Sequence, residues 1–179
     1  MAITSSKISS VCIWQVCHKY TILLVIVLIC KGLAAQGFFT SSDSLNKNRL
    51  IGVVATETVG TVGSLAALNA VWYSQHPRSG FHTFDDSKEW LQMDKVGHTM
   101  TAYYIGYAGI KALKWAGVER KKSIWYGGGL GWVYQSGLEM LDAYSVGWGF
   151  SWTDMAANTL GTGLVIGQEL LWDDQRIKM

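Results

Sequence analysis

Residues 93–107 read MDKVGHTMTAYYIGY, an apolar and aromatic run that begins with charged and ionisable side chains. Asp94 and His98 are four residues apart, so a helix would place both on one face, with Lys95 beside them. The segment that follows, as far as Trp115, is mostly small, apolar or aromatic. The stretch therefore predicts a helix that carries a polar cluster at one end of a mostly apolar fold.

The composition favours association with a membrane. Hydrophobic residues make up 49% of the 179 residues and charged residues only 16%, whereas ordinary soluble domains hold about 25% charged residues. One proline beside 20 glycines and nine tryptophans argues against a disordered chain and for closely packed helices. At this length the chain can form one domain with a core of its own.

The first 35 residues are predicted to be a signal peptide for Sec-type export. Lys7, His18 and Lys19 precede the apolar run YTILLVIVLIC, and small residues follow in GLAAQG. This order of basic, apolar and small residues is typical of secretory leaders, and the apolar run is shorter than the roughly 20 residues that a spanning helix needs. We therefore predict cleavage after Ala35.

All three cysteines, Cys12, Cys17 and Cys30, lie in this leader, so the mature chain is expected to have neither disulfides nor thiolate chemistry. Cys30 could instead accept a lipid anchor, although Ile29 before it is bulky where a lipoprotein signal needs a small residue. The leader holds three of the 15 basic residues and none of the 13 acidic ones, which leaves 12 basic against 13 acidic. Nothing in this balance favours nucleic acid as a partner.

A polar lead-in, residues 36–49, precedes a helical, membrane-associated domain at residues 50–179. Four helices are expected, at residues 50–73, 94–115, 123–141 and 151–172. Ser151 and Asp154 form a capping start to the last of them, and Asp85 or Asp86 is expected to cap a short helix in the connector before the second. VERKKS is expected to form a tight basic turn between the second and third helices, and in an up-down arrangement alternate helix ends share a side.

None of the four expected helices has the single charged face of a helix in a soluble bundle. The small-residue pairs Gly127–Gly131 and Gly163–Gly167 would instead let backbones approach closely, as in helices surrounded by lipid. Tryptophans fall into two groups at opposite helix ends, which resembles a pair of interfacial belts. These groups are Trp72, Trp90, Trp148 and Trp152, and Trp115, Trp125 and Trp172. We predict an all-α antiparallel bundle of about four mostly apolar, glycine-rich helices embedded in a membrane; a soluble glycine-rich bundle is the alternative.

In such an up-and-down bundle, polar side chains of three helices meet at one end. They are Asp94, Lys95, His98, Glu139, Asp142, Ser151, Asp154 and Asn158. Ionisable groups inside a membrane are costly and mark either function or tight pairing. Three roles remain open. The histidine and carboxylates could bind a divalent cation, His98 could act in general acid–base catalysis with Asp94 or Asp154 as its partner, or the network could be structural.

Three pieces of the sequence, DKVGH, GWVYQSGLEMLD and FSWTDMAANTLG, resemble the YfiM-type predicted periplasmic lipoproteins, a family of unknown function. The patterns DK-x-x-H and S-x-x-D-x-x-A-N-x-x-G are also similar to VanZ-like membrane proteins, which are linked to glycopeptide (teicoplanin) resistance. The resemblance spans residues 38–177 and implies a helical, membrane-associated envelope protein. It places Gly161 and the eight polar residues above at signature positions, and it supplies no reaction.

We expect a non-enzymatic component of a cell-envelope membrane that recognises the headgroup of a lipid or cell-wall precursor, directly or through a divalent cation. The membrane would be the inner one, or the outer one with the cluster facing the periplasm. The alternatives are a membrane-embedded hydrolase or transferase, with His98, Asp94 and Asp154 as candidate catalytic residues, and a purely structural envelope protein. No G-x-S-x-G motif is present, and Ser136 and Ser151 lack an activating context, so the sequence favours binding over catalysis.

Overall fold

The computed structural model describes residues 40–88 and 90–179. The predicted signal peptide, its cleavage site and all three cysteines lie outside these residues. The chain divides into two units, Met1–Ser41 and Ser42–Met179, and the helices of the described chain belong to the second.

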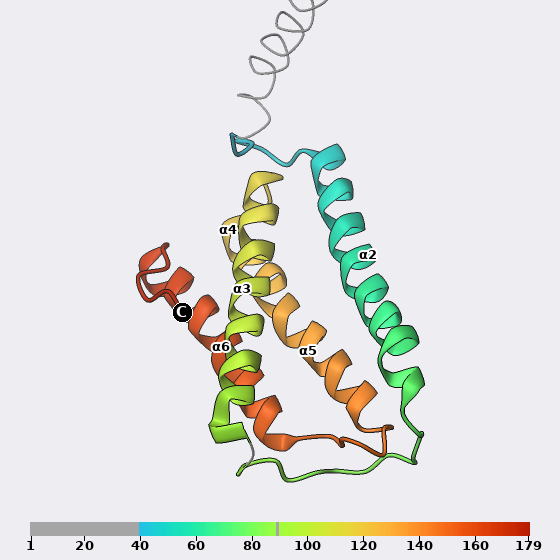
Figure 1. Ribbon diagram of the computed structural model, residues 1–179. Coiled ribbons are helices and arrows are strands. Elements are labelled where there is room, and N and C mark those ends of the chain that lie inside the picture. Colours follow the sequence, from blue (N-terminus) through green and yellow to red (C-terminus); the bar gives the residue numbers. More distant parts are fainter. Residues whose placement is uncertain (1–39, 89) are drawn as a thin grey trace, which may run out of the picture. The chain divides into compact units, whose positions relative to one another are not determined.

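Four long helices make up this unit (Figure 1): α2 (Lys47–Val71), α3 (Met93–Trp115), α5 (Gly128–Asp142) and α6 (Trp152–Trp172). The short elements are η1 (Tyr73–Gln75), η2 (Trp90–Gln92), α4 (Arg120–Lys122) and the π-helix η3 (Ser123–Gly127), which runs directly into α5. Two isolated β-bridges, Arg78 with Ser145 and Thr83 with Phe150, join the connector before α3 to the loop before α6. The all-helical prediction is confirmed for the described residues, and the helices start and end within a few residues of the predicted positions.

Side-chain caps fix two of the helix starts. Asn46 accepts a hydrogen bond from the backbone N–H of Arg49 and starts α2 three residues before the predicted position. Ser151 Oγ accepts from the N–H of Asp154 at 3.0 Å, which is the predicted start of α6. Both residues satisfy backbone donors that the first helical turn leaves unpaired.

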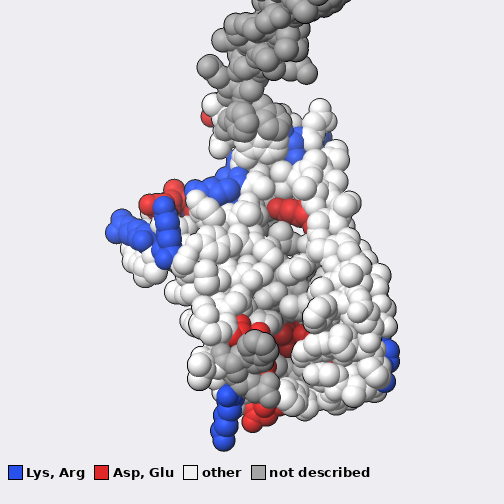
Figure 2. All heavy atoms as spheres, in the orientation of Figure 1, with Lys and Arg blue, Asp and Glu red and all other residues white. Residues whose placement is uncertain are grey.

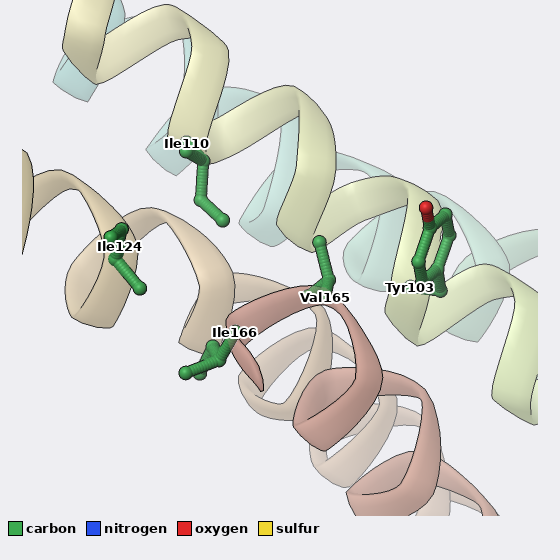
Figure 3. Close-up of a cluster of buried hydrophobic side chains, with 5 residues drawn as sticks. All are labelled: Tyr103, Ile110, Ile124, Val165 and Ile166. Atoms are coloured by element: carbon green, nitrogen blue, oxygen red, sulfur yellow. The ribbon is translucent and has the colours of Figure 1, made fainter. Parts of the chain in front are cut away.

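Helix α3 lies at the centre, against both α5 and α6 (Figure 1). Its residues Tyr103 and Ile110 form the larger buried apolar cluster with Ile124 of η3 and with Val165 and Ile166 of α6 (Figure 3). Burial of such side chains is worth about 1.5–3 kcal/mol each. The cluster fixes α3 against the other two helices and so positions the polar residues at their ends.

Glycines allow these three helices to approach closely. A Cβ on Gly131 would lie 2.1 Å from the carbonyl oxygen of Ala102, and one on Gly161 would lie 2.1 Å from that of Thr99. The expectation for the pair Gly127–Gly131 is confirmed, since Gly127 also packs on the α3 backbone. The expectation for the pair Gly163–Gly167 is wrong, because a Cβ on either residue would meet nothing within 4 Å. Two residues of helix turn the chain by about 200°, so residues 161 and 163 face nearly opposite directions.

Helix α2 is the least buried of the four long helices. Val53 is its one buried residue; it packs on Leu113 of α3 and on Ala116, the residue that follows α3. Apolar side chains such as Val59 and Val62 are 71% and 62% exposed. Among the described residues, the segment Lys47–Gln75 is the one helix whose length and apolar composition suffice for crossing a membrane.

Charged residues lie towards the ends of the unit, as the face in Figure 2 shows, with a largely uncharged surface between them. Residues 96–110, 123–138 and 155–168 contain no Lys, Arg, Asp or Glu. At about 1.5 Å per residue, each of these stretches is roughly 21–24 Å long. The three central helices therefore share an uncharged middle segment, and the predicted polar cluster lies just beyond one end of it.

Candidate functional site

A cleft of about 640 Å³ opens at the end of the bundle where α3 and α6 begin and α2 and α5 end. Its ionisable lining residues are Asp86, Asp94, Lys95, His98, Asp142 and Asp154. Its aromatic lining residues are Trp72, Tyr73, Phe84 and Trp148. Trp148 packs against Trp72 and Tyr73, with ring centroids 6.1 and 5.7 Å away. The cleft is thus lined by both acidic and aromatic side chains.

Lys95 lies among three carboxylates. Its Nζ is 2.5 Å from Asp86 Oδ2, 2.8 Å from Asp154 Oδ1 and 3.1 Å from Asp94 Oδ2. Burial alone would lower the pKa of Lys95, but these carboxylates outweigh burial and raise it. The ammonium group therefore neutralises the cluster, and it is not free to contact a ligand's anionic group.

Asp86 belongs to the site, although the sequence suggested only a helix cap for it or for Asp85. Its Oδ1 accepts hydrogen bonds from Ser151 Oγ at 2.8 Å and from Thr153 Oγ1 at 2.7 Å. Burial raises the pKa of Asp86, but the bonds from Lys95, Thr153 and Ser151 hold it well below its usual range. A residue of the connector thus ties the start of α3 to the start of α6.

The imidazole of His98 is held by amides from two other helices. Its Nδ1 lies 3.1 Å from Asn158 Oδ1 and 3.1 Å from Gln135 Nε2. Neither amide contacts Nε2, which is 3.7 Å from Asp94 Oδ1. The ring is therefore oriented by α5 and α6, and its second nitrogen faces the cleft.

Two carboxyl groups of α5 lie beside the cluster. Glu139 is 1% exposed. Its Oε2 accepts a hydrogen bond from the Ser151 N–H at 3.0 Å, and burial raises its pKa to about 8. Asp142 accepts a hydrogen bond from Tyr73 OH at 2.6 Å, and burial raises its pKa to about 6. Among the described residues, neither carboxyl group forms an ion pair with a lysine or an arginine.

Asp154 completes the arrangement at the start of α6. Burial raises its pKa and Lys95 opposes that rise. One potential ligand atom from each of Asp94, His98 and Asp154 lies within 4.8 Å of the others, which makes them a set that could hold a metal ion. The antiparallel arrangement thus brings the imidazole of His98 close to the carboxylate of Asp154, as the sequence predicted.

All eight predicted residues lie at this end of the bundle, but they make different contacts. Ser151 caps α6 and donates to Asp86, and Asn158 orients His98. Sequence reasoning missed Asp86, Tyr73 and Gln135. For Gln135 a signal existed, because it precedes Glu139 by four residues and so shares its helical face.

No serine of the described chain is poised as a nucleophile beside His98. Ser151 Oγ caps α6 and donates to Asp86, and Ser136 Oγ donates to the carbonyl of Trp132 at 2.7 Å. An activated serine needs a hydrogen bond to its general base, and the two amide partners of His98 occupy the nitrogen on the bundle side.

The model of a family described as predicted periplasmic lipoprotein (DUF2279) matches residues 80–167. This segment holds α3, α5, most of α6 and all eight predicted site residues. The match agrees with the resemblance to predicted periplasmic lipoproteins and with an envelope location after export; the similarity to VanZ-like proteins is not shown. No curated protein and no solved structure matches the chain.

Proposed function

We propose that this chain, which matches the predicted periplasmic lipoproteins over residues 80–167, is a membrane-embedded envelope protein that binds the polar headgroup of a lipid or cell-wall precursor without catalysing a reaction. The observation that carries the proposal is the acidic and aromatic cleft at the charged end of an otherwise uncharged helical body. Such a cleft would lie at the level of lipid headgroups when the uncharged segments lie among the acyl chains.

Three features support membrane embedding. The helical segment Lys47–Gln75 is long and apolar enough to cross a bilayer, and the uncharged segments of α3, α5 and α6, each roughly 21–24 Å long, would extend through about three quarters of its ~30 Å hydrocarbon core. The close approach of α3 to its neighbours at glycines is the packing that lipid-surrounded helices use. Exposed tryptophans lie near both ends of the body, as interfacial anchors do. They are Trp72 and Trp152 at the cleft end and Trp125 and Trp172 at the other.

We predict that the full-length chain stays in the membrane fraction after an alkaline carbonate wash and is released by detergent. The exposed apolar faces of α2 and of the central helices would be covered by acyl chains, and carbonate removes only proteins bound through charge. Western blotting of a tagged chain in the wash and detergent fractions measures this, with a soluble periplasmic protein as the control. Release by carbonate alone would contradict membrane embedding.

The charges of the cleft limit the headgroup chemistry. Three carboxylates, of Asp86, Asp94 and Asp154, surround the ammonium group of Lys95, and the carboxyl groups of Asp142 and Glu139 lie beside this cluster. A purely anionic headgroup would be repelled by the carboxylates of Asp86, Asp94 and Asp154, which already pair with Lys95. The cleft instead suits a positive charge, which the aromatic rings can also stabilise by cation–π contact. That charge is either an ammonium group of the ligand or a bound metal cation.

We predict that the detergent-purified chain, in the presence of a chelator, retains phosphatidylethanolamine in preference to phosphatidylglycerol. Only the former carries an ammonium group that can lie between the carboxylates and Trp148. Native mass spectrometry of the protein with equal amounts of the two lipids measures retention. Trp148→Ala should lower retention of phosphatidylethanolamine roughly tenfold, which corresponds to about 1.4 kcal/mol, within the range of cation–π contacts.

The matched control is Trp172→Ala, an exposed tryptophan at the opposite end of the body. It should retain both lipids as the parent chain does. Equal retention of the two lipids by the parent chain, or unchanged retention in Trp148→Ala, would overturn headgroup binding through an ammonium group.

A further inference from the structure

We propose that Asp94, His98 and Asp154 bind one divalent transition-metal cation, with Zn²⁺ preferred over Mg²⁺ and Ca²⁺, at the base of the cleft. The inference deepens the proposed function and rests on it in one respect: the cation would be the group that receives an anionic part of the headgroup. The site itself stands on geometry that can be tested without any lipid.

The three side chains are placed for a shared ion. Asp94 and His98 lie four residues apart on one face of α3, and Asp154 comes from the first turn of α6. Their ligand atoms lie within 4.8 Å of one another, and Asp94 Oδ1 is 3.7 Å from His98 Nε2. Donors about 2.1 Å from one tetrahedral ion are roughly 3.4 Å apart. Asp94 Oδ1 and His98 Nε2 are already near this spacing, and the Asp94 side chain, 44% exposed, has room to adjust.

Lys95 leaves the required oxygens free. Its Nζ contacts Asp94 through Oδ2 and Asp154 through Oδ1. Asp94 Oδ1 therefore points at His98 Nε2, and Asp154 keeps its second oxygen. Each carboxylate can hold the ammonium group with one oxygen and the metal ion with the other.

The surroundings of His98 are those of a metal-bound histidine. Such a histidine almost always donates its other ring N–H to a carbonyl or carboxylate, which fixes the ring and the tautomer. Asn158 Oδ1 lies 3.1 Å from Nδ1 and can accept that bond when the Gln135 amide, whose Nε2 also lies 3.1 Å from Nδ1, turns its oxygen to this side. Nε2 then keeps its lone pair on the side of Asp94. The residue that fixes the ring, Asn158, is fully buried.

A second observation is a buried carboxyl oxygen without a hydrogen-bond partner beside the His98 ring. Glu139 Oε1 is buried, has no hydrogen-bond partner among the described residues and lies 3.8 Å from His98 Nδ1. An unpaired buried carboxyl oxygen is costly. A divalent ion on His98 would turn the imidazole into a stronger donor towards this side of the ring and would offset the excess of carboxylates.

The donor set decides which ion is preferred. One imidazole nitrogen with two carboxylates suits Zn²⁺, which accepts both donor types, whereas Mg²⁺ and Ca²⁺ favour sites made of oxygen alone. Three protein ligands leave at least one coordination position open towards the cleft. A phosphate oxygen or a water molecule can occupy that position.

The test uses the full chain purified in detergent, stripped with a chelator and dialysed. ZnCl₂ alone is then titrated calorimetrically, and the retained metal is measured by elemental analysis. We expect one Zn²⁺ per chain, with no competition from excess Mg²⁺ or Ca²⁺. His98→Gln and Asp94→Asn should each weaken binding on the order of tenfold or more, since loss of an outer partner alone costs 10- to 100-fold.

The matched controls are His82→Gln, a histidine of the connector, and Glu119→Gln, an exposed carboxylate; both should bind Zn²⁺ as the parent chain does. Far-UV circular dichroism confirms that each variant is folded. No Zn²⁺ on the parent chain, or equal affinity in a folded Asp94→Asn variant, overturns the metal site. Because the lipid experiment above is done with a chelator, failure of Zn²⁺ binding leaves its result intact, and loss of lipid retention leaves Zn²⁺ binding intact.

Discussion

Replacing Gly161 with alanine is expected to force α3 and α6 apart and to destabilise the whole helical body. The added Cβ would lie 2.1 Å from the backbone carbonyl oxygen of Thr99, and 3.2 Å from the Cβ of Ala102. A backbone atom in a helix cannot rotate away as a flexible side chain can, so the helices must separate. Overpacking usually costs about 1–3 kcal/mol, and this contact should cost about 3 kcal/mol or more. Thermal unfolding followed by circular dichroism should show a Tm lower by roughly 10 °C.

The same helix supplies the control. Gly163 and Gly167 have nothing within 4 Å of an added Cβ, so Gly163→Ala and Gly167→Ala should be neutral or stabilising, because alanine is favoured over glycine within a helix by up to about 1 kcal/mol. Gly161→Ala should also disturb the site, since the hydrogen bond from His98 to Asn158 joins the same two helices. Equal stability of all three variants would show that α3 and α6 do not pack as described.

Replacing Lys95 with methionine should destabilise the chain by about 3 kcal/mol at pH 7. The substitution keeps most of the apolar stem and removes the charge that three carboxylates share. Removing one partner of a buried ion pair typically costs 3–5 kcal/mol, because the other charge is left uncompensated. The lower end of this range is appropriate, since the cleft is open and the Asp94 side chain is 44% exposed.

The effect of this substitution on the free energy of unfolding should depend on pH, and the pKa of Asp86 sets the direction of that dependence. Hydrogen bonds, first among them that of Lys95, hold the folded-state pKa of Asp86 below its usual value of 3.8. Such a group stabilises the folded state above the unfolded pKa, and this stabilisation is lost as pH falls through the folded pKa. The difference in unfolding free energy between the parent chain and Lys95→Met should therefore be large at pH 7 and smaller below pH ~4.

Denaturant unfolding at pH 7 and pH 3.5 measures that difference. The control is Lys122→Met, whose ammonium group pairs with Glu119 at 3.0 Å while both side chains are more than 60% exposed. Exposed pairs contribute about 0–1 kcal/mol, so this variant should match the parent chain closely at both pH values. A Lys95→Met effect as small as that of Lys122→Met would contradict the buried ion cluster.

Much of the helical fold could be predicted from local patterns. Long uncharged runs, the cap at Ser151 and the glycine after Trp115–Ala116 set the helices and most of their ends. The convergence of Asp94, His98 and Asp154 followed from two simple facts: residues four apart share a helical face, and short connections make neighbouring helices antiparallel. Both facts depend only on spacing along the chain.

Other parts of the site could not be read from spacing. Asp86 contacts Ser151 and Thr153 across 65 and 67 residues, and Tyr73 contacts Asp142 across 69. The path of an irregular connector carries no periodic signal, so nothing in the sequence indicates where it returns to the bundle. The glycine pair chosen from its spacing was also wrong, because a periodic pattern does not say which face of a helix meets its neighbour.

The sequence alone determined that this protein is helical, that its helices have uncharged middles, and that ionisable groups gather at one end, because these properties are local and periodic. Only the tertiary structure decided that Lys95 forms ion pairs with three carboxylates and that Gly161 is a glycine at which α6 touches α3. It also decided that Nε2 of His98 faces Asp94 while side-chain amides contact Nδ1. Those features depend on the relative rotation of packed helices and on the course of the connector, which are set by long-range packing.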